Sequence, residues 1–336
     1  MTQRARVLSE EVACLVHDVL SDPETCPLGQ LPSVRGRSMV RPSFNGESSM
    51  IVIAGASGHV GGRAAHQLLA EYTPVKVIVR SPAKAVAFAS PMAEVAQGDL
   101  TDTGFLTDAL RGATAFFALL PPDFGAADFY GAQRRTADAI AAAVRASEVP
   151  HVVLLSSIGA DLADGNGPIK GLHYFEEALR ATGTTLSAIR AGYFQENLAS
   201  AVAPARAMGL FFNMAPSQDY PLAMIATRDI GELAARTLKA RPAASEIIDL
   251  QGPAYSARQQ AELLGAAVGK PLTIVDVPPA GQAAAMIQGG VPAQAAAAYA
   301  EMNAGFAAGI IAPKGDRLEQ GTTPLDTTIA ALLAAS

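Results

Sequence analysis

A glycine-rich turn near residue 55 constrains the fold of this chain more than any other feature of its sequence. Residues 51–62 read Ile-Val-Ile-Ala-Gly-Ala-Ser-Gly-His-Val-Gly-Gly, so an apolar run typical of a buried strand leads directly into a series of glycines. Gly55 permits a tight turn, Gly58 allows the backbone to approach a pyrophosphate, and Gly61 allows the following helix to pack on the strand. The first N–H groups of that helix can bind phosphate. The alternative is a glycine-rich turn that serves only packing. It would explain Gly61 but not Ser57 and Gly58 together. The turn therefore predicts a dinucleotide site that includes Gly55, Ser57, Gly58, His59, Val60 and Gly61.

The end of the second predicted strand indicates which dinucleotide this site prefers. NAD enzymes usually carry Asp or Glu there, because a carboxylate accepts a hydrogen bond from the ribose 2′-OH. This chain continues Val77-Ile-Val-Arg80-Ser-Pro-Ala-Lys84, with no acidic residue. The cationic groups of Arg80 and Lys84 suit the 2′-phosphate of NADP. We therefore expect NADP(H) to be favoured over NAD(H). The alternative is that Arg80 is an ordinary surface charge.

The ends of three further strands supply more candidate cofactor residues, because ligands of open α/β sheets bind at the carboxyl ends of the strands. Asp99 and Leu100 follow the third strand, where the Asp99 carboxylate can accept a hydrogen bond from the adenine amino group. Alternatively, Asp99 or Thr101 caps a helix that starts near Thr103. The other candidates are Leu119 and Leu120 after the fourth strand, and Ser156, which either contacts the cofactor or caps the next loop.

From residue 50 onward, apolar runs alternate with longer amphipathic stretches. This alternation predicts an α/β fold of the Rossmann type, a doubly wound parallel sheet with right-handed crossovers. The expected strands cover residues 50–54, 75–80, 94–96, 115–120, 152–156, 185–190 and 246–250. The expected helices cover residues 60–71, 82–89, 103–111, 126–147, 171–182, 230–238 and 257–268, with further helices around a break in 280–310.

We expect the chain to divide into three parts. Residues 1–49 carry a cluster of prolines, and Met50 stands directly before the first strand, so this extension is expected to be disordered or a non-native start, with a regulatory tail as the alternative. Residues 50–190 are the expected dinucleotide-binding Rossmann core. Residues 191–336 are the expected mixed substrate region, a small C-terminal α/β domain from which a strand and a helix return to the core.

The composition excludes several classes of protein. The net charge of −6 gives no electrostatic footprint for nucleic acid. No apolar run reaches the ~18–20 residues that a membrane helix needs. Both cysteines precede residue 50, and the histidines do not pair at ligand spacing, so neither a disulfide scaffold nor a metal site is expected. We expect a cytoplasmic protein that contacts neither membrane nor nucleic acid directly.

Several separated motifs run from residue 50 toward the C-terminus. They are Gly55-Ala-Ser-Gly-His-Val-Gly61, Val79-Arg80, Gly98-Asp99, Glu176-Glu-Ala-Leu-Arg180, Ile189-Arg-Ala-Gly-Tyr-Phe-Gln-Glu-Asn197 and Ile225-Ala-Thr-Arg-Asp-Ile230. Together they resemble the NmrA-like proteins, a branch of the atypical short-chain dehydrogenases/reductases. The resemblance implies a Rossmann domain with a small C-terminal substrate domain. The family includes NAD(P)H-dependent quinone and azo reductases, plant reductases, and regulators that bind a dinucleotide without turnover, so it implies the fold and cofactor better than the reaction.

The chain departs from the catalytic pattern of many short-chain dehydrogenases. Those enzymes pair a tyrosine with a lysine four residues later, so that the phenol can pass a proton to a carbonyl. Here Tyr174 is followed by Ala178, and Leu172 stands where plant-type reductases carry a lysine. The neighbouring His173 is a candidate catalytic residue, since imidazole titrates near neutral pH. The alternative is a solvent-facing histidine.

Tyr193 is the second candidate catalytic residue. It follows the sixth strand with Phe194, and an aromatic pair at this place can stack on a flat acceptor. Packing between the two parts of the chain is the alternative, especially for Phe194.

Two hypotheses about function remain open. The first is a reductase that passes a hydride from NADP(H) to a small, flat, apolar acceptor such as a quinone, which solvent can protonate. The second is a non-catalytic redox sensor that binds a dinucleotide and regulates a partner protein. The absence of the Tyr/Lys pair favours the second hypothesis but does not exclude the first. A protein partner or a homodimer is compatible with either.

Overall fold

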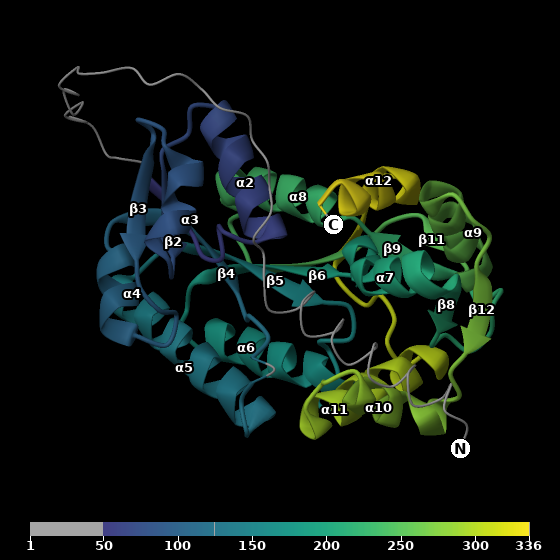
Figure 1. Cartoon of the computed structure of the whole chain (residues 1–336). Coiled ribbons are helices and arrows are strands. Elements are labelled where there is room, and N and C mark those ends of the chain that lie inside the picture. Colours follow the sequence, from purple (N-terminus) through teal and green to yellow (C-terminus); the bar gives the residue numbers. More distant parts are fainter. Residues whose placement is uncertain (1–49, 124, 336) are drawn as a thin grey trace, which may run out of the picture.

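The computed structural model of the chain describes residues 50–123 and 125–335 and shows a parallel sheet with helices on both faces (Figure 1). Hydrogen bonds join its eight strands in the order β13-β10-β6-β5-β4-β1-β2-β3. The strand order reverses between β1 and β4, which is where ligands of such sheets bind. The strands are β1 (Met50–Ile53), β2 (Val75–Val79), β3 (Ala93–Gln97), β4 (Ala113–Leu119), β5 (His151–Ser157), β6 (Thr185–Ala191), β10 (Glu246–Gln251) and β13 (Arg317–Gln320).

The central strands form because their apolar side chains are buried on both faces, as parallel sheets require. Ile53 and Phe117 point to one face, under α2 (His59–Ala70) and α8 (Thr227–Ala240). Val52 and Phe116 point to the other face, under α4 (Thr103–Leu110), α5 (Phe129–Ser147) and α6 (Lys170–Arg180). The two helical layers are seen above and below the sheet in Figure 1. The Rossmann-type fold expected from the sequence is confirmed.

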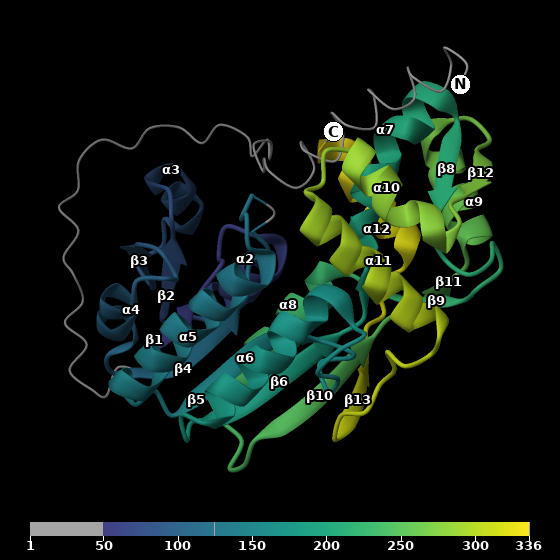
Figure 2. The ribbon, with the colours of Figure 1, turned by 90° about the horizontal axis from the view of Figure 1, so that it is seen from below.

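The C-terminal half adds two small sheets and several helices, which gather at one end of the molecule in Figure 2. β7 (Tyr193–Phe194), β9 (Leu222–Ile225) and β11 (Ala254–Tyr255) form one sheet, and β8 (Leu210–Asn213) pairs with β12 (Thr273–Asp276) in the other. The helices are α7 (Ala199–Met208), α9 (Ala257–Val268), α10 (Pro279–Gln288), α11 (Ala293–Ala307) and α12 (Leu325–Ala335). Short 3₁₀ helices are η1 (Val86–Phe88), η2 (Gly167–Ile169) and η3 (Gln195–Leu198).

Two predicted helices differ from those observed. The helix expected over 82–89 divides into α3 (Pro82–Ala85) and η1. The helix expected from residue 126 begins only at Phe129, because Asp128 is its N-cap and accepts a hydrogen bond from the Gly131 N–H. The strand expected over 246–250 does return to the large sheet, as β10. The expectations for residues 1–49 lie outside the described residues.

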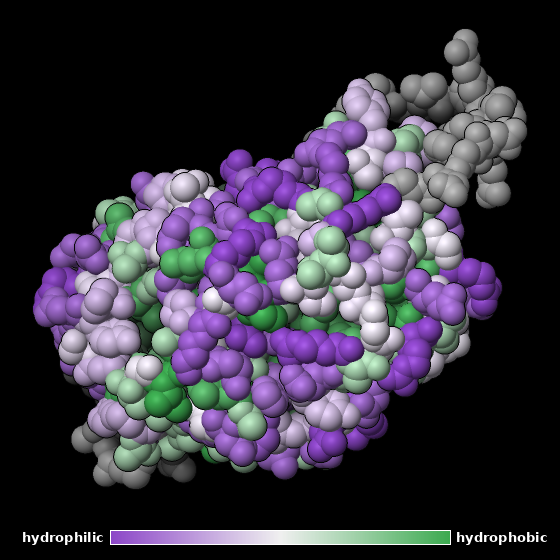
Figure 3. Space-filling view, turned by 180° about the vertical axis from the view of Figure 1, so that it is seen from behind, coloured by the Kyte–Doolittle hydropathy of each residue, from purple (hydrophilic) through white to green (hydrophobic). Residues whose placement is uncertain are grey.

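The surface is mixed in character. The face seen in Figure 3 carries mostly hydrophilic residues with small hydrophobic groups between them. Within the described part of the chain, none of the helices combines the length and the apolar character needed to span a bilayer.

Candidate functional site

The glycine turn joins β1 to α2 at the switch point of the sheet. Gly55 has φ +62°, a conformation that side chains rarely adopt, and an added Cβ would lie 2.3 Å from Leu119 Cδ2 at the end of β4. A Cβ at Gly61 would lie 2.5 Å from the carbonyl oxygen of Gly55. The tight turn at Gly55 and the close helix packing at Gly61 are therefore required by the protein itself.

Gly58 differs from the other two glycines. A Cβ added there would meet only the Gly55 carbonyl oxygen, at 3.4 Å, which is ordinary contact distance. Among residues 50–123 and 125–335, no packing excludes a side chain at this position. Free space beside an exposed backbone is what the approach of a phosphate group needs, so this geometry fits the predicted dinucleotide site.

The start of α2 offers backbone donors to an anion. Gly58 is the N-cap and provides no side-chain cap. The first N–H groups of a helix have no intrahelical acceptor, and the helix dipole favours negative charge there. Ser57 and His59 are exposed beside these groups, whereas the Val60 side chain is buried in the core and leaves only its backbone toward a ligand.

The connection after β2 carries the two predicted cations. Arg80 follows the last residue of β2 and is exposed, and its carbonyl oxygen accepts a hydrogen bond from the Gln97 side chain at 3.4 Å. Lys84 is half-buried in the last turn of α3. Both therefore lie at the end of the second strand, where the sequence predicts contact with a 2′-phosphate.

Asp99 lies across from this connection, at the end of β3. Its Oδ1 accepts hydrogen bonds from the hydroxyl and the backbone N–H of Thr101, at 2.6 and 2.8 Å. These bonds, aided by the charge of Arg80, lower the pKa of Asp99. The alternative in which Asp99 or Thr101 caps α4 is wrong, because Asp102 is the N-cap and accepts from the Phe105 N–H at 3.0 Å. Asp99 thus remains available to a ligand through its second oxygen.

The ends of β4 and β5 differ in what they present. Leu119 and Leu120 are half-buried at the end of β4, and Leu119 abuts the glycine turn. The Ser156 side chain is instead buried in the sheet, and its hydroxyl donates to Glu176 Oε1 at 2.6 Å. The contact predicted between Ser156 and the cofactor stays a prediction.

A buried ion pair that the sequence reasoning missed lies directly behind Ser156. Glu176 of α6 is fully buried and accepts from Nε and Nη2 of Arg190 at 2.9 and 2.7 Å. Glu176 Oε2 also accepts from Arg180 at 2.7 Å. Burial disfavours the charge of Arg190, but these bonds and nearby carboxylates outweigh it, so its pKa is raised. One sequence feature could have indicated this pair. Arg190 is the single charged residue inside the apolar run of β6, and a buried charge needs a partner.

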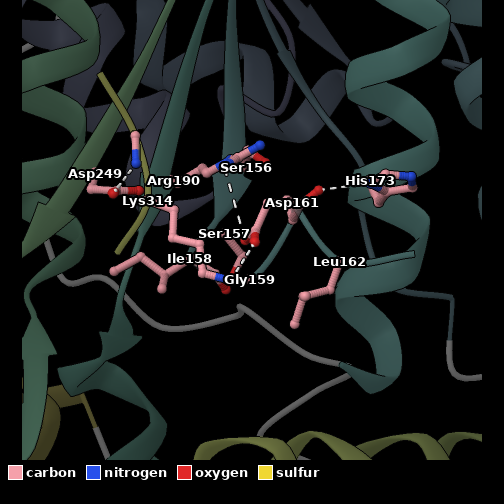
Figure 4. A network of polar contacts seen from close by, with 12 residues as sticks. Ser156, Ser157, Ile158, Gly159, Asp161, Leu162, His173, Arg190, Asp249 and Lys314 are labelled. Atoms are coloured by element: carbon pink, nitrogen blue, oxygen red, sulfur yellow. Dashed lines mark hydrogen bonds and ion pairs between the residues drawn. The ribbon is translucent and has the colours of Figure 1, made fainter. Parts of the chain in front are cut away.

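The network continues from Arg190 toward the C-terminal segment (Figure 4). Arg190 lies in register between Ser156 on β5 and Asp249 on β10. Burial raises the pKa of Asp249, against the opposing effect of a hydrogen bond from the Gly315 N–H at 2.5 Å and the charge of Arg190. Asp161 lies 4.0 Å from Arg190 and accepts from Lys314 at 2.9 Å.

The loop after β5 is held from several sides. The Asn166 amide, fully buried, donates to the carbonyl oxygens of Gly159 and Leu162 at 2.9 and 2.8 Å. His173, labelled in Figure 4, has its Nδ1 at 2.9 Å from the Ala160 carbonyl oxygen. Because a carbonyl can only accept, Nδ1 donates this hydrogen bond, and Nε2 is the ring nitrogen left to contact a ligand. His173 is thus tied to the loop that borders the site.

Two tyrosines meet beyond β6. Tyr193 of β7 is half-buried, and burial raises the pKa of its phenol although a hydrogen bond with Asn197 opposes this. Burial, and to a smaller extent the neighbouring Tyr193, raises the pKa of Tyr299 on α11 to about 12. Both phenols are therefore neutral at physiological pH, so each carries a proton that it can donate in a hydrogen bond. Tyr299 was not among the predicted site residues.

The position of the missing lysine is apolar. Leu172 packs in a cluster with Ile158, Ala160 and Ile311. Tyr174 points instead to α5, where its hydroxyl donates to Asp138 at 2.5 Å. Among the residues that the structure describes, no group of three or more His, Cys, Asp or Glu side chains could hold a metal ion.

Comparison with known proteins relates the chain to one family. The model of the NmrA-like family matches residues 47–325. An NAD(P)H azoreductase of Xenophilus azovorans is 27% identical over 261 residues, which cover 76% of this chain and 86% of the relative. Quinone oxidoreductase 2 of Escherichia coli is 27% identical over 263 residues, covering 77% and 89%. The names of both relatives agree with the oxidoreductase expected from the sequence.

The fold also matches solved structures. The crystal structure of an NADPH-dependent quinone oxidoreductase of Escherichia coli complexed with NADPH superposes with a TM-score of 0.64 at 23% identity. The match covers 84% of this chain and all of the other. At this identity the likeness supports the Rossmann-type fold alone.

Proposed function

The chain belongs to the NmrA-like family, and we propose that it is an NADPH-dependent reductase that passes a hydride to a small, flat acceptor such as a quinone. The observation that carries the proposal is the contrast within the glycine turn. Gly55 and Gly61 are required by internal contacts, whereas Gly58 faces open space at the start of α2. Such a turn suits a bound pyrophosphate.

Different residues around the turn would bind different parts of the cofactor. Backbone N–H groups at the start of α2 would hold the pyrophosphate, and Arg80 and Lys84 would bind the 2′-phosphate. Asp99 would accept from the adenine amino group. When bound, NADPH supplies the hydride. The relatives support a nicotinamide dinucleotide, and the preference for its phosphorylated form rests on Arg80 and Lys84.

The other end of the site would position the acceptor. Tyr193 and Phe194 offer aromatic surface, and the neutral phenols of Tyr193 and Tyr299 can donate hydrogen bonds to a carbonyl oxygen. A quinone takes its proton readily from solvent, so its reduction needs orientation more than a strong general acid. This agrees with the apolar residue Leu172 in place of a lysine.

Turnover of NADPH with a panel of quinones tests the proposal. The absorbance of the reduced nicotinamide should fall with the wild type and not with Gly58→Asp, whose carboxylate would repel the pyrophosphate. Binding of NADPH without turnover of any acceptor would instead support the alternative, a dinucleotide sensor that regulates a partner protein.

The two candidate catalytic residues can be tested in the same assay. A residue that donates a proton in the transition state contributes typically ~100-fold or more to the rate. His173→Gln should lower kcat by that factor if Nε2 donates, and by less than about tenfold if His173 only holds the loop. Tyr193→Phe keeps the aromatic ring and removes the hydroxyl, whereas Tyr193→Ala removes both. If KM rises in Tyr193→Ala but not in Tyr193→Phe, the residue acts by stacking on the acceptor.

A further inference from the structure

A groove in the C-terminal region lies outside the dinucleotide site. It encloses about 790 Å³, within the ~300–1,000 Å³ typical of small-molecule sites. Its walls come from the segment after β8, the start of α9, the segment between β12 and α10, and the last turns of α11. None of these lining residues belongs to the eight-stranded sheet or to the glycine turn.

Part of the lining of the groove is apolar. Pro216 and Pro278 line it from two connecting segments, Pro279 from the start of α10, and Ala304 and Ala307 from α11. Proline rings and single methyl groups offer hydrocarbon surface without side-chain hydrogen-bonding atoms. This surface suits an apolar body.

Buried amides hold the groove open. Gln282, which is 3% exposed, donates to the Met214 carbonyl oxygen at 2.9 Å, and its own Oε1 accepts from Asn303 at 2.9 Å. These bonds connect α10, α11 and the segment after β8. The space between the three elements is therefore built by specific contacts.

One carboxylate in the groove has no cationic partner among the residues that the structure describes. Asp276 accepts one hydrogen bond on each oxygen, from the amides of Asn213 at 2.8 Å and Gln218 at 2.9 Å. These bonds lower the pKa of Asp276, so it stays ionised. The other carboxylate, Asp219, is paired with Arg258 at 3.0 Å. The groove thus presents an exposed negative charge beside this apolar surface.

We propose that this groove binds a small organic cation, a protonated amine carried on an apolar body. The ammonium group would lie against Asp276, and the body would lie against the prolines and the alanines of α11. Charge complementarity selects the cation, and the hydrocarbon lining favours an apolar body. The proposal is independent of the reductase function.

Three isosteric probes test the charge requirement. 1-Naphthylmethylamine is a cation at neutral pH, 1-naphthylmethanol is neutral, and 1-naphthoate is an anion. The chain contains no tryptophan, so naphthyl fluorescence anisotropy reports binding without that background. The cation should bind at least tenfold more tightly than the alcohol, and more weakly at high salt. Equal binding of the cation and the alcohol would overturn the proposal.

Two variants test the location, with NADPH binding as the check that each is folded. Asp276→Asn removes the charge and should weaken the cation about tenfold, whereas Asp108→Asn on the exposed surface of α4 should not. Ala304→Phe adds a benzyl group to the exposed apolar lining without changing the charge and should weaken binding at least tenfold. Unchanged cation affinity in Ala304→Phe would place binding elsewhere and refute the site, even if Asp276→Asn failed to fold.

Discussion

The charged side chains at the two ends of the candidate cofactor site differ in their exposure to solvent. At the proposed adenine end, Arg80 and Asp99 are exposed. At the other end, Glu176 is fully buried, and Arg190 and Asp249 are 6% and 2% exposed. Exposed charges can change with little cost to the fold, because water solvates them. Buried charges must be paired, so a change there costs stability first. The first end can therefore tune the ligand, while the second fixes the structure that carries the site.

Breaking the buried pair should give the largest effect. Glu176→Gln leaves the Arg190 guanidinium buried without a full countercharge, and we expect a loss of about 3–5 kcal/mol in the free energy of unfolding. Denaturant unfolding measures this. Glu177→Gln is the matched control on the same helix, since the Glu177 side chain is 61% exposed, and should change stability by less than about 0.5 kcal/mol. Equal losses in both variants would remove the distinction between the two ends.

A second buried group extends the comparison to the amino end of β5. His151 is 2% exposed and lies 3.1 Å from the Ser187 hydroxyl, and burial lowers its pKa to about 4 from 6.5. Above pH 6.5 both folded and unfolded states hold neutral imidazole. As the pH falls from 6.5 to 4, the unfolded state binds a proton that the folded state resists. Stability should therefore fall by up to about 3 kcal/mol through this window.

Urea unfolding at pH 7.5 and 4.5 checks this contribution. Other groups also titrate in acid, so the informative quantity is the difference between wild type and His151→Gln, which cannot be protonated. The variant should lose less stability between the two pH values. If both proteins lose the same amount, His151 does not contribute.

The sequence predicted where the exposed candidate residues lie in the fold, and their contact with a cofactor stays a prediction. It did not predict the buried pair. Gly55, Arg80 and Asp99 lie within or directly beside regular apolar strands, so local pattern places them. Glu176 and Arg190 lie on separate elements, and a lone charge in an apolar run indicates a partner without identifying it. The same limit applies to Tyr299, whose neighbour Tyr193 is far away in the chain.

The C-terminal half shows the corresponding limit for secondary structure. β7 and β11 have two residues each, too few for any periodicity to be read. β13 reads Arg-Leu-Glu-Gln, without an apolar run, because it is the edge strand of the sheet. These strands form by pairing with strands that lie far away in the sequence. The local pattern of apolar and polar residues does not identify those partners.

At the exposed end, reversing one charge should change the ligand and spare the fold. Arg80→Asp removes the proposed contact to the 2′-phosphate and adds an acceptor for a ribose hydroxyl. A charged hydrogen bond is worth ~1.5–3 kcal/mol, so the preference for NADPH over NADH should fall about tenfold to a hundredfold. Titration of both cofactors measures this, with Arg111→Asp at the C-cap of α4 as the control. Equal affinity of the wild type for NADH and NADPH would contradict the assignment.

The smallest change, one methyl group, sharpens the comparison within the glycine turn itself. Gly61→Ala places a Cβ 2.5 Å from the Gly55 carbonyl oxygen, so α2 must shift, and overpacking of this kind costs typically ~1–3 kcal/mol. Gly58→Ala meets the same oxygen only at 3.4 Å, so its cost should be limited to the poorer N-cap, less than ~1 kcal/mol. It should nevertheless weaken NADPH, because the methyl group occupies the space proposed for the pyrophosphate. Thermal unfolding with and without NADPH separates the two effects, and a Gly58→Ala protein that binds NADPH as tightly as the wild type would show that the open space at Gly58 is not the phosphate site.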